Sequence, residues 1–270
     1  MNNFFQRSLT GLLMVIVLIG SLLLHPFLFA LVFLLINIVA LIEFYKLAAL
    51  SHSRPQNKYG NIVGTFIFLA GFLWYQFDWG PYVSLLIIPF LTFIFIFELY
   101  RVRKQPLLHL ATTLLGLVYV SFPLMLVNHL AYFDGSYNGK IVLGIFILIW
   151  LSDTGAYVFG VTLGKHKLFE RISPKKTWEG FIGGIMVSLG GSFLLARYMG
   201  IFELHEWAIV AGIVGVFGTL GDLVESMLKR SVSIKDSGNL LPGHGGILDR
   251  FDSFLFAIPV IFTYLYFFVR

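Results

Sequence analysis

The fold class is decided by one stretch of the sequence, Phe27-Leu-Phe-Ala-Leu-Val-Phe-Leu-Leu-Ile-Asn-Ile-Val-Ala-Leu-Ile-Glu-Phe44. Its only charged residue is Glu43, close to the end of the stretch. The hydrocarbon core of a bilayer is about 30 Å thick and an α-helix rises about 1.5 Å per residue, so a span needs about 20 mostly apolar residues. This stretch therefore predicts a transmembrane helix.

The composition of the whole chain of 270 residues agrees with that prediction. Hydrophobic residues make up 58% of the chain and charged residues 12%, and the mean hydropathy is +0.86. A soluble domain has about 25% charged residues, so this composition excludes a soluble globule, a disordered chain and a coiled coil. The chain has no cysteine, which excludes disulfides, zinc sites built from thiolates and cysteine nucleophiles.

Apolar segments of span length recur along the chain, and helix breakers such as Pro26, Pro55, Pro106 and Pro242 lie in the gaps between them. The segments lie near Ser8–Leu24, Phe27–Phe44, Ile62–Phe77, Tyr82–Leu99, Leu107–Leu130, Ile141–Phe159, Phe181–Ala196, Trp207–Met227 and Phe254–Val269. We therefore expect an all-α fold, a polytopic transmembrane helical bundle with about nine spans.

Basic residues are distributed unevenly between the two sides of this bundle. With the N-terminus inside, all but three of the 19 Lys and Arg residues fall on the inner side, the exceptions being Lys140, Arg197 and Arg270. Basic loops mark the cytoplasmic side of membrane proteins, so the N-terminus is expected in the cytoplasm. The net charge of +5 is spread over separate loops, and such a distribution does not make a nucleic-acid-binding face.

Polar residues are concentrated in the second half of the chain. Residues 1–140 contain four acids, all near predicted span ends, whereas residues 150–252 contain the other ten. We expect one continuous membrane domain, with residues 1–140 as an N-terminal transmembrane scaffold and residues 141–270 as a C-terminal catalytic part.

The first polar motif, Trp150-Leu-Ser-Asp153-Thr-Gly-Ala-Tyr157, lies within a predicted span. Asp153 falls roughly in the middle of that span, where an ionised carboxylate is costly and needs a cation or a polar cavity. Asp153 is therefore a candidate metal ligand. A packing role among the small residues of the same helix face is the other interpretation.

The second motif, Ser173-Pro-Lys-Lys-Thr-Trp-Glu-Gly180, lies in a loop on the expected cytoplasmic side. Pro174 and Thr177 suit the start of a helix, whose free N–H groups attract anions. Together with the paired lysines and two hydroxyls, they predict a segment that binds phosphate. Ordinary cytoplasmic lysines that touch only lipid headgroups would give the same charge.

The third motif combines a glycine stripe with a charged helix face. Four glycines recur at every third residue: Gly212, Gly215, Gly218 and Gly221. Four polar residues follow at offsets that place them on one face of a helix: Asp222, Glu225, Ser226 and Lys229. Close helix packing explains the glycines, but it does not explain a face that carries both acids and a base.

The chain then runs through a glycine-rich loop, Pro242-Gly-His-Gly-Gly246, to Asp249. Such a loop exposes backbone amides and allows a ligand to approach the backbone closely. If Asp222 and Asp249 meet at the cytoplasmic ends of their helices, they form a site of hard oxygen ligands, which suits Mg²⁺. A loop held by salt bridges is the other interpretation. His244 is more typical of a phosphate contact than of a zinc ligand, because no second ligand lies at zinc spacing.

The segment from Ser226 to Asp252 resembles the signature of the phosphatidate cytidylyltransferases, also called CDP-diacylglycerol synthases. The matching residues are Ser226, Lys229, Arg230, Lys235, Asp236, Pro242, His244, Gly245, Gly246, Asp249, Arg250 and Asp252. The runs from Asp153 to Tyr157 and from Ser173 to Gly180 look like the upstream blocks of the same family. Before Leu151 only the hydropathy and the number of spans agree.

This resemblance implies a membrane enzyme, a nucleotidyltransferase of phospholipid biosynthesis, that converts CTP and phosphatidic acid into CDP-diacylglycerol and pyrophosphate. It also implies Mg²⁺ at the acids that match Asp222 and Asp249, K⁺ beside it in some members, and a homodimer. A multi-pass protein of the inner (plasma) membrane with its active site facing the cytoplasm is expected.

The motifs and the resemblance together predict three groups of functional residues. The catalytic residues are Asp222, Asp249, Lys229, Arg230 and His244. The residues that bind substrate are Ser173, Lys175, Lys176, Thr177, Ser226, Lys235, Asp236, Gly245, Gly246 and Arg250. The metal ligands are Asp222 and Asp249, with Asp153 and Glu225 as further ligands or as residues behind them.

Two other functions remain open on the sequence. A CTP-dependent polyprenol kinase also joins CTP to a membrane lipid, and it differs in its products, a phospholipid and CDP. A secondary transporter would also place acids inside a bundle, but it should show matching broken helices in two halves, and here the polar motifs lie in one half only. The sequence contains no Gly-x-x-x-x-Gly-Lys-Ser/Thr, which excludes a P-loop kinase or ATPase.

Overall fold

The computed structural model describes residues 3–238 and 245–270, and in those residues the chain is almost entirely helical. Its internal contacts divide it into two units. The first unit comprises Met1–Gly139 and Ser231–Arg250, and the second comprises Lys140–Arg230 and Phe251–Arg270. The segment that carries most of the predicted signature, Ser231–Arg250, thus groups with the N-terminal half of the chain.

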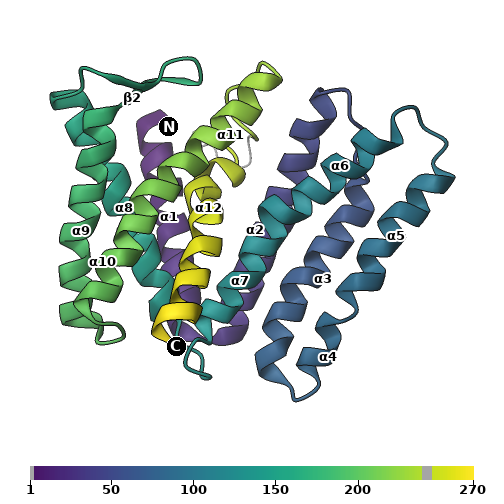
Figure 1. Cartoon of the computed structure of the whole chain (residues 1–270), viewed down its shortest axis with the longest axis horizontal. Helices are drawn as coiled ribbons and strands as arrows, with labels where there is room; N and C mark the ends of the chain where they lie inside the picture. The colour runs from purple at the N-terminus through teal and green to yellow at the C-terminus, as the bar shows by residue number, and fades with distance from the viewer. Residues whose placement is uncertain (1–2, 239–244) are drawn as a thin grey trace. The chain divides into compact units, whose positions relative to one another are not determined.

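The first unit is a bundle of helices in which α3 lies between α2 and α5 (Figure 1). Its elements are α1 (Asn3–Leu24), α2 (Pro26–Leu50), α3 (Asn57–Gln76), α4 (Gly80–Ser84), α5 (Ile87–Tyr100), α6 (Pro106–Gly116), the π-helical turn η1 (Leu117–Ser121) and α7 (Phe122–Ala131). Aromatic side chains fill the core, and Phe29, Phe33 and Phe68 are completely buried. Between helices in a membrane such close packing is the main attraction.

The break between α1 and α2 follows from His25 and Pro26. Pro26 is the first residue of α2, where its missing N–H costs nothing and its fixed φ suits the helix. The His25 side chain accepts a hydrogen bond from the Phe27 N–H at 3.3 Å and so caps the helix. The predicted helix breaker in this gap is confirmed.

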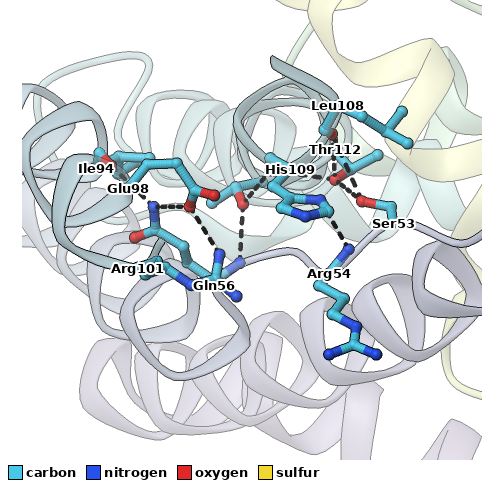
Figure 2. Close-up of polar contacts among 10 residues, drawn as sticks. Ser53, Arg54, Gln56, Ile94, Glu98, Arg101, Leu108, His109 and Thr112 are labelled. Carbon is cyan, nitrogen blue, oxygen red and sulfur yellow. Dashed lines mark hydrogen bonds and ion pairs between the residues drawn. The ribbon is translucent and has the colours of Figure 1, made fainter. Parts of the chain in front are cut away.

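The connection between α2 and α3 is held from two sides by polar side chains (Figure 2). Gln56 donates from its Nε2 to the Glu98 carboxylate of α5 at 2.9 Å, and its N–H donates to the Thr113 hydroxyl of α6 at 2.9 Å. The Arg54 N–H donates to Nδ1 of the buried His109, also on α6, at 3.0 Å. Buried polar groups thus satisfy one another and fix this connection against α5 and α6.

The second unit contains the remaining helices and one small sheet. Its elements are α8 (Gly139–Thr162), β1 (Lys167–Phe169), β2 (Ser173–Thr177), α9 (Trp178–Met199), α10 (Leu204–Ile213), the π-helical turn η2 (Val214–Gly218), α11 (Thr219–Ser231), α12 (Leu248–Tyr264) and η3 (Leu265–Val269). The first turn of α12, up to Arg250, belongs to the first unit. Helix α9 packs along α10 (Figure 1). It also approaches α8 closely, since a Cβ on Gly155 would lie 2.8 Å from the Val187 side chain.

The predicted fold class is confirmed. In the described residues every predicted apolar segment falls in a helical stretch, and seven helices are long and apolar enough to cross a membrane. Residues Thr10–Leu24 form a shorter apolar helix, so the predicted number of nine spans is approximate. Large apolar side chains such as Leu99 and Leu107 are exposed, as lipid-facing residues are in a multi-pass membrane protein.

Candidate active site

Helix α11 carries the predicted charged face. Ser226 Oγ donates to Asp222 Oδ1 at 3.2 Å, and Lys229 Nζ donates to Glu225 Oε2 at 2.6 Å. Both pairs are four residues apart, which is the spacing of neighbours on a helix surface. The prediction that these four side chains share one face is confirmed.

The second motif meets the third through one ion pair. Lys176 Nζ of β2 lies 2.7 Å from Asp222 Oδ2 of α11, within the second unit. The side chains of Lys176 and Asp222 are 26% and 38% exposed, so a ligand in solution can reach both of them. Lys176 and Asp222 are more than forty residues apart in the sequence, and thus bring opposite charges from two motifs to one place.

The second motif forms one strand of an antiparallel pair, directly before the helix start that Pro174 and Thr177 predict. Strand β2 pairs with β1, and α9 begins one residue later, at Trp178. The Glu179 carboxylate accepts hydrogen bonds from the N–H groups of Lys165 and His166 and so closes the turn before β1. The motif therefore presents its lysines from an extended segment.

The predicted start of a helix at Thr177 is confirmed. The Thr177 hydroxyl accepts the Gly180 N–H at 3.2 Å and caps α9. Thr177 is buried, Ser173 is half-buried and Lys175 is exposed. Of the four residues predicted to bind phosphate here, Thr177 already has a structural role, while the two lysines are open to solvent.

Asp252 lies within electrostatic reach of two other carboxylates of the second unit. Asp252, on α12, interacts with the charges of Asp222 and Asp153 and with that of Lys229. Gly221 makes the approach of α11 to α12 possible, since a Cβ there would lie 2.7 Å from the Asp252 carbonyl oxygen and 2.6 Å from Phe256 Cβ. Asp252 belongs to the residues that carry the family resemblance, but no role of its own is predicted for it.

Asp249 is held by the backbone of the first unit. Its Oδ2 accepts the N–H of Gly246 at 2.7 Å and the N–H of Ser237 at 3.0 Å. Gly245 has φ of +82°, a left-handed conformation that glycine adopts without strain. The Gly246 N–H thus has an acceptor within the chain, where the sequence predicted an amide exposed to a ligand.

The remaining predicted site residues that the structure describes lie at the surface. Lys235, Asp236, Arg250 and Arg230 are all exposed. These four side chains are therefore accessible to a substrate from solution. His244 lies outside the described residues.

The donor chemistry on the second unit fits a hard divalent cation. Asp153, Asp222 and Asp252 offer carboxylate oxygens, which Mg²⁺ prefers. In residues 3–238 and 245–270 no three His, Cys, Asp or Glu side chains gather closely enough to form a metal site by themselves. Asp249 belongs to the other unit, so its pairing with Asp222 on one ion stays a prediction.

These residues combine acids that attract a cation with bases that attract phosphate. The Lys176 ammonium neutralises Asp222 through a long, flexible side chain, and an incoming cation can take over that role. A released lysine is then available to a phosphate oxygen. Such an exchange suits a site that binds a nucleotide together with its metal ion.

Comparison with known proteins places the chain among cytidylyltransferases. Residues 5–268 match the model of the cytidylyltransferase family. The chain is 53% identical over 122 residues to a phosphatidate cytidylyltransferase of Staphylococcus haemolyticus (strain JCSC1435), which is 44% of this chain and 46% of that protein. It is 52% identical over 122 residues, with the same shares, to that of Staphylococcus aureus (strain COL). The aligned segment thus spans about half the length of these relatives.

Proposed function

The chain belongs to the cytidylyltransferase family, and on that premise we propose that it transfers CMP from CTP to phosphatidic acid. The products are CDP-diacylglycerol and pyrophosphate, which makes the reaction a step of phospholipid biosynthesis. The relatives support the proposal, since they are named phosphatidate cytidylyltransferases and about half of their residues in the aligned segment are identical to those of this chain. The observation that carries it is the ion pair between Lys176 and Asp222, which joins two of the family-like motifs.

The lipid phosphate is the nucleophile. A phosphate monoester has a second pKa of about 6, so it is mostly dianionic at neutral pH. One of its oxygens forms a bond to the α-phosphorus of CTP, while the bond from that phosphorus to the pyrophosphate oxygen breaks and its electron pair leaves with pyrophosphate. No proton has to be removed from the nucleophile, so the protein's tasks are positioning and charge neutralisation.

Cationic side chains perform the neutralisation. Lys175 and Lys176 extend from β2, and Lys229 and Arg230 lie at the end of α11, all in the second unit. We propose that they hold the triphosphate and the lipid phosphate. We propose that three residues of the first unit also bind these phosphates: Lys235, His244 and Arg250.

The acids are proposed to hold Mg²⁺. Asp222 and Asp249 are assigned as ligands from the family resemblance, with Asp153 as a further ligand. Bound Mg²⁺ supplies further neutralisation of the charge that builds up on the departing pyrophosphate. The Glu225 carboxylate is buried and bound to Lys229, so we propose that it orients that lysine.

The position of the reaction follows from its substrates. CTP comes from the cytosol and phosphatidic acid from the bilayer, so the site has to lie where the two meet. The basic loops favour the cytoplasmic face of the inner membrane. A homodimer and a K⁺ ion beside the Mg²⁺ are further proposals from the resemblance.

The test is a product analysis with the full-length chain in detergent micelles that contain phosphatidic acid. CTP is labelled either in cytidine or in the γ-phosphate. We expect the cytidine label in the lipid extract and the γ label in pyrophosphate, and neither transfer when phosphatidic acid is omitted or EDTA is added. If the γ label enters lipid while cytidine leaves as CDP, the chain is a lipid kinase and the proposal is wrong.

A further inference from the structure

Glu43 is a buried acid inside a membrane-spanning helix. It lies near the end of α2 and is only 4% exposed. A carboxylate in such a place is costly unless donors surround it. The sequence placed Glu43 in the scaffold and gave it no partner, so the residues that satisfy it are informative.

Among the described residues, three groups donate to the Glu43 carboxylate, and all three lie about two hundred residues further along the chain. Its Oε2 accepts the Leu248 N–H at 2.8 Å and the Ser237 hydroxyl at 3.3 Å, and its Oε1 accepts the Ile247 N–H at 3.1 Å. Leu248 is the first residue of α12. The N–H groups in the first turn of a helix have no acceptor within that helix. Glu43 therefore caps α12 from a different helix, within the first unit.

Two glycines allow the carboxylate to come this close. A Cβ added to Gly238 or to Gly246 would overlap the Glu43 carboxylate. Any other residue at either position would push the backbone away from Glu43. We call Ser237, Gly238 and residues 245–249 the anchored turn.

The anchored turn connects Glu43 to a proposed metal ligand. Ser237 gives its hydroxyl to Glu43 and its N–H to Asp249. Gly246 lies against Glu43 and gives its N–H to Asp249 at 2.7 Å. A shift of the turn relative to Glu43 would therefore move Asp249 as well.

We infer that Glu43 is a positioning residue for the reaction, and that it fixes the anchored turn, and with it Asp249, from the N-terminal half of the chain. The role of Asp249 rests on the proposed function, whereas the anchoring itself does not. Glu43 touches neither substrate in this scheme. It acts on catalysis through the geometry of the turn, where a displacement of about 1 Å can cost about 100-fold in rate.

The test compares Glu43→Gln with a matched control, Glu98→Gln, in the full-length chain. Glu43→Gln keeps the size of the side chain but turns an N–H₂ group toward N–H donors. Glu98 is an equally buried glutamate, at 5% exposure, and its partners, Gln56 and Arg101, lie outside the turn (Figure 2). Amide exchange measured by mass spectrometry reports on the backbone of 245–250 without requiring activity.

We expect Glu43→Gln to accelerate amide exchange at Ile247 and Leu248 about tenfold, the equivalent of one lost charge-assisted hydrogen bond. Exchange elsewhere stays unchanged, and Glu98→Gln leaves these two amides as in the wild type. In the CMP-transfer assay Glu43→Gln lowers kcat about 100-fold and raises the KM for CTP. A loss of folded protein alone would lower kcat and leave KM unchanged.

Unchanged exchange at Ile247 and Leu248 in Glu43→Gln overturns the inference, and so does an equal acceleration in Glu98→Gln. If Glu43→Gln does not fold, Ser237→Ala removes a single donor and should still accelerate exchange in the turn. No acceleration in that variant overturns the inference too. If the wild-type chain transfers no CMP, the proposed function fails, while the exchange data still decide whether Glu43 anchors the turn.

Discussion

The two carboxylates assigned to the metal ion are held in opposite ways. Asp222 pairs with the ammonium group of Lys176 and with a serine hydroxyl on its own helix. Asp249 accepts backbone N–H groups of Ser237 and Gly246 in the anchored turn. A lysine side chain can swing away from its partner, whereas a backbone N–H leaves only when the turn refolds.

This difference separates an exchangeable part of the proposed site from a fixed part. On α11 the charges can be redistributed when a nucleotide and a cation arrive. The backbone of the anchored turn is held by two acids, Glu43 and Asp249, so the turn does not have to rearrange when the substrates bind. Groups that are fixed before the reaction neutralise developing charge without a cost of reorganisation, and in the proposed site the anchored turn supplies that fixed part.

The largest effect is expected from removing the charge of either carboxylate. Asp222→Asn and Asp249→Asn should each lower the rate of CMP transfer by about 10²–10³-fold, because an amide binds a cation poorly. The Asn at position 249 can still accept the N–H groups of Gly246 and Ser237, so amide exchange in the turn should change little. The assay measures cytidine incorporation into lipid over a range of Mg²⁺ concentrations.

Glu170→Gln is the control for these two variants, since Glu170 is an exposed acid of the second unit outside the site. It should behave as the wild type. Near-normal turnover in Asp222→Asn or Asp249→Asn, with the protein folded, would refute the assignment of that residue to the metal.

A smaller effect is expected at Lys176. Lys176→Ala removes the partner of Asp222 and one proposed phosphate contact, and the KM for CTP should rise about tenfold, as for one charge-assisted bond between partly exposed groups. Lys176→Arg keeps the charge and should recover part of the loss. Lys167→Ala, at an exposed position of the neighbouring strand, is the control. An unchanged KM and kcat in Lys176→Ala would remove this lysine from the site.

The smallest effect on turnover is expected from the packing of α11. Gly221→Ala places a Cβ 2.6 Å from Phe256 Cβ, and such overpacking costs about 1–3 kcal/mol. The midpoint of thermal unfolding should fall and turnover should fall only a few-fold. Gly212→Ala is the matched control on the same continuous helix, because nothing lies within 4 Å of its added Cβ. Equal melting temperatures in the two variants would contradict the close approach of α11 to α12.

Much of the fold was predictable because its helices are long apolar runs with breakers between them. The shared face of Asp222 and Glu225 was predictable too, since it depends only on helical spacing. The strand pair at Lys167–Phe169 and Ser173–Thr177 was not, because three residues are too few to show an alternating pattern. The turn before β1 is closed by hydrogen bonds to Glu179, which no local pattern indicates either.

Glu43 was missed for a different reason. Its partners are 194 to 205 residues away in the chain, and one acid in an apolar run gives no signal about which distant donors it meets. Its position near the end of a span looked like an ordinary boundary residue. The sequence predicts that Gly246 lets a ligand approach the backbone, whereas in the structure its close neighbour is the Glu43 carboxylate. Gly238, for which the sequence predicts no such role, lies against the same carboxylate.

The most direct test of the proposed chemistry follows the oxygens of the lipid phosphate. Phosphatidic acid labelled with ¹⁸O at all three terminal oxygens is incubated with unlabelled CTP, Mg²⁺ and the full-length chain, and CDP-diacylglycerol is analysed by mass spectrometry. Attack of the lipid phosphate on the α-phosphorus of CTP predicts a product that retains all three labels, with unlabelled pyrophosphate. A CDP-diacylglycerol that has lost one label would show that the lipid phosphorus was attacked instead, and would contradict the account.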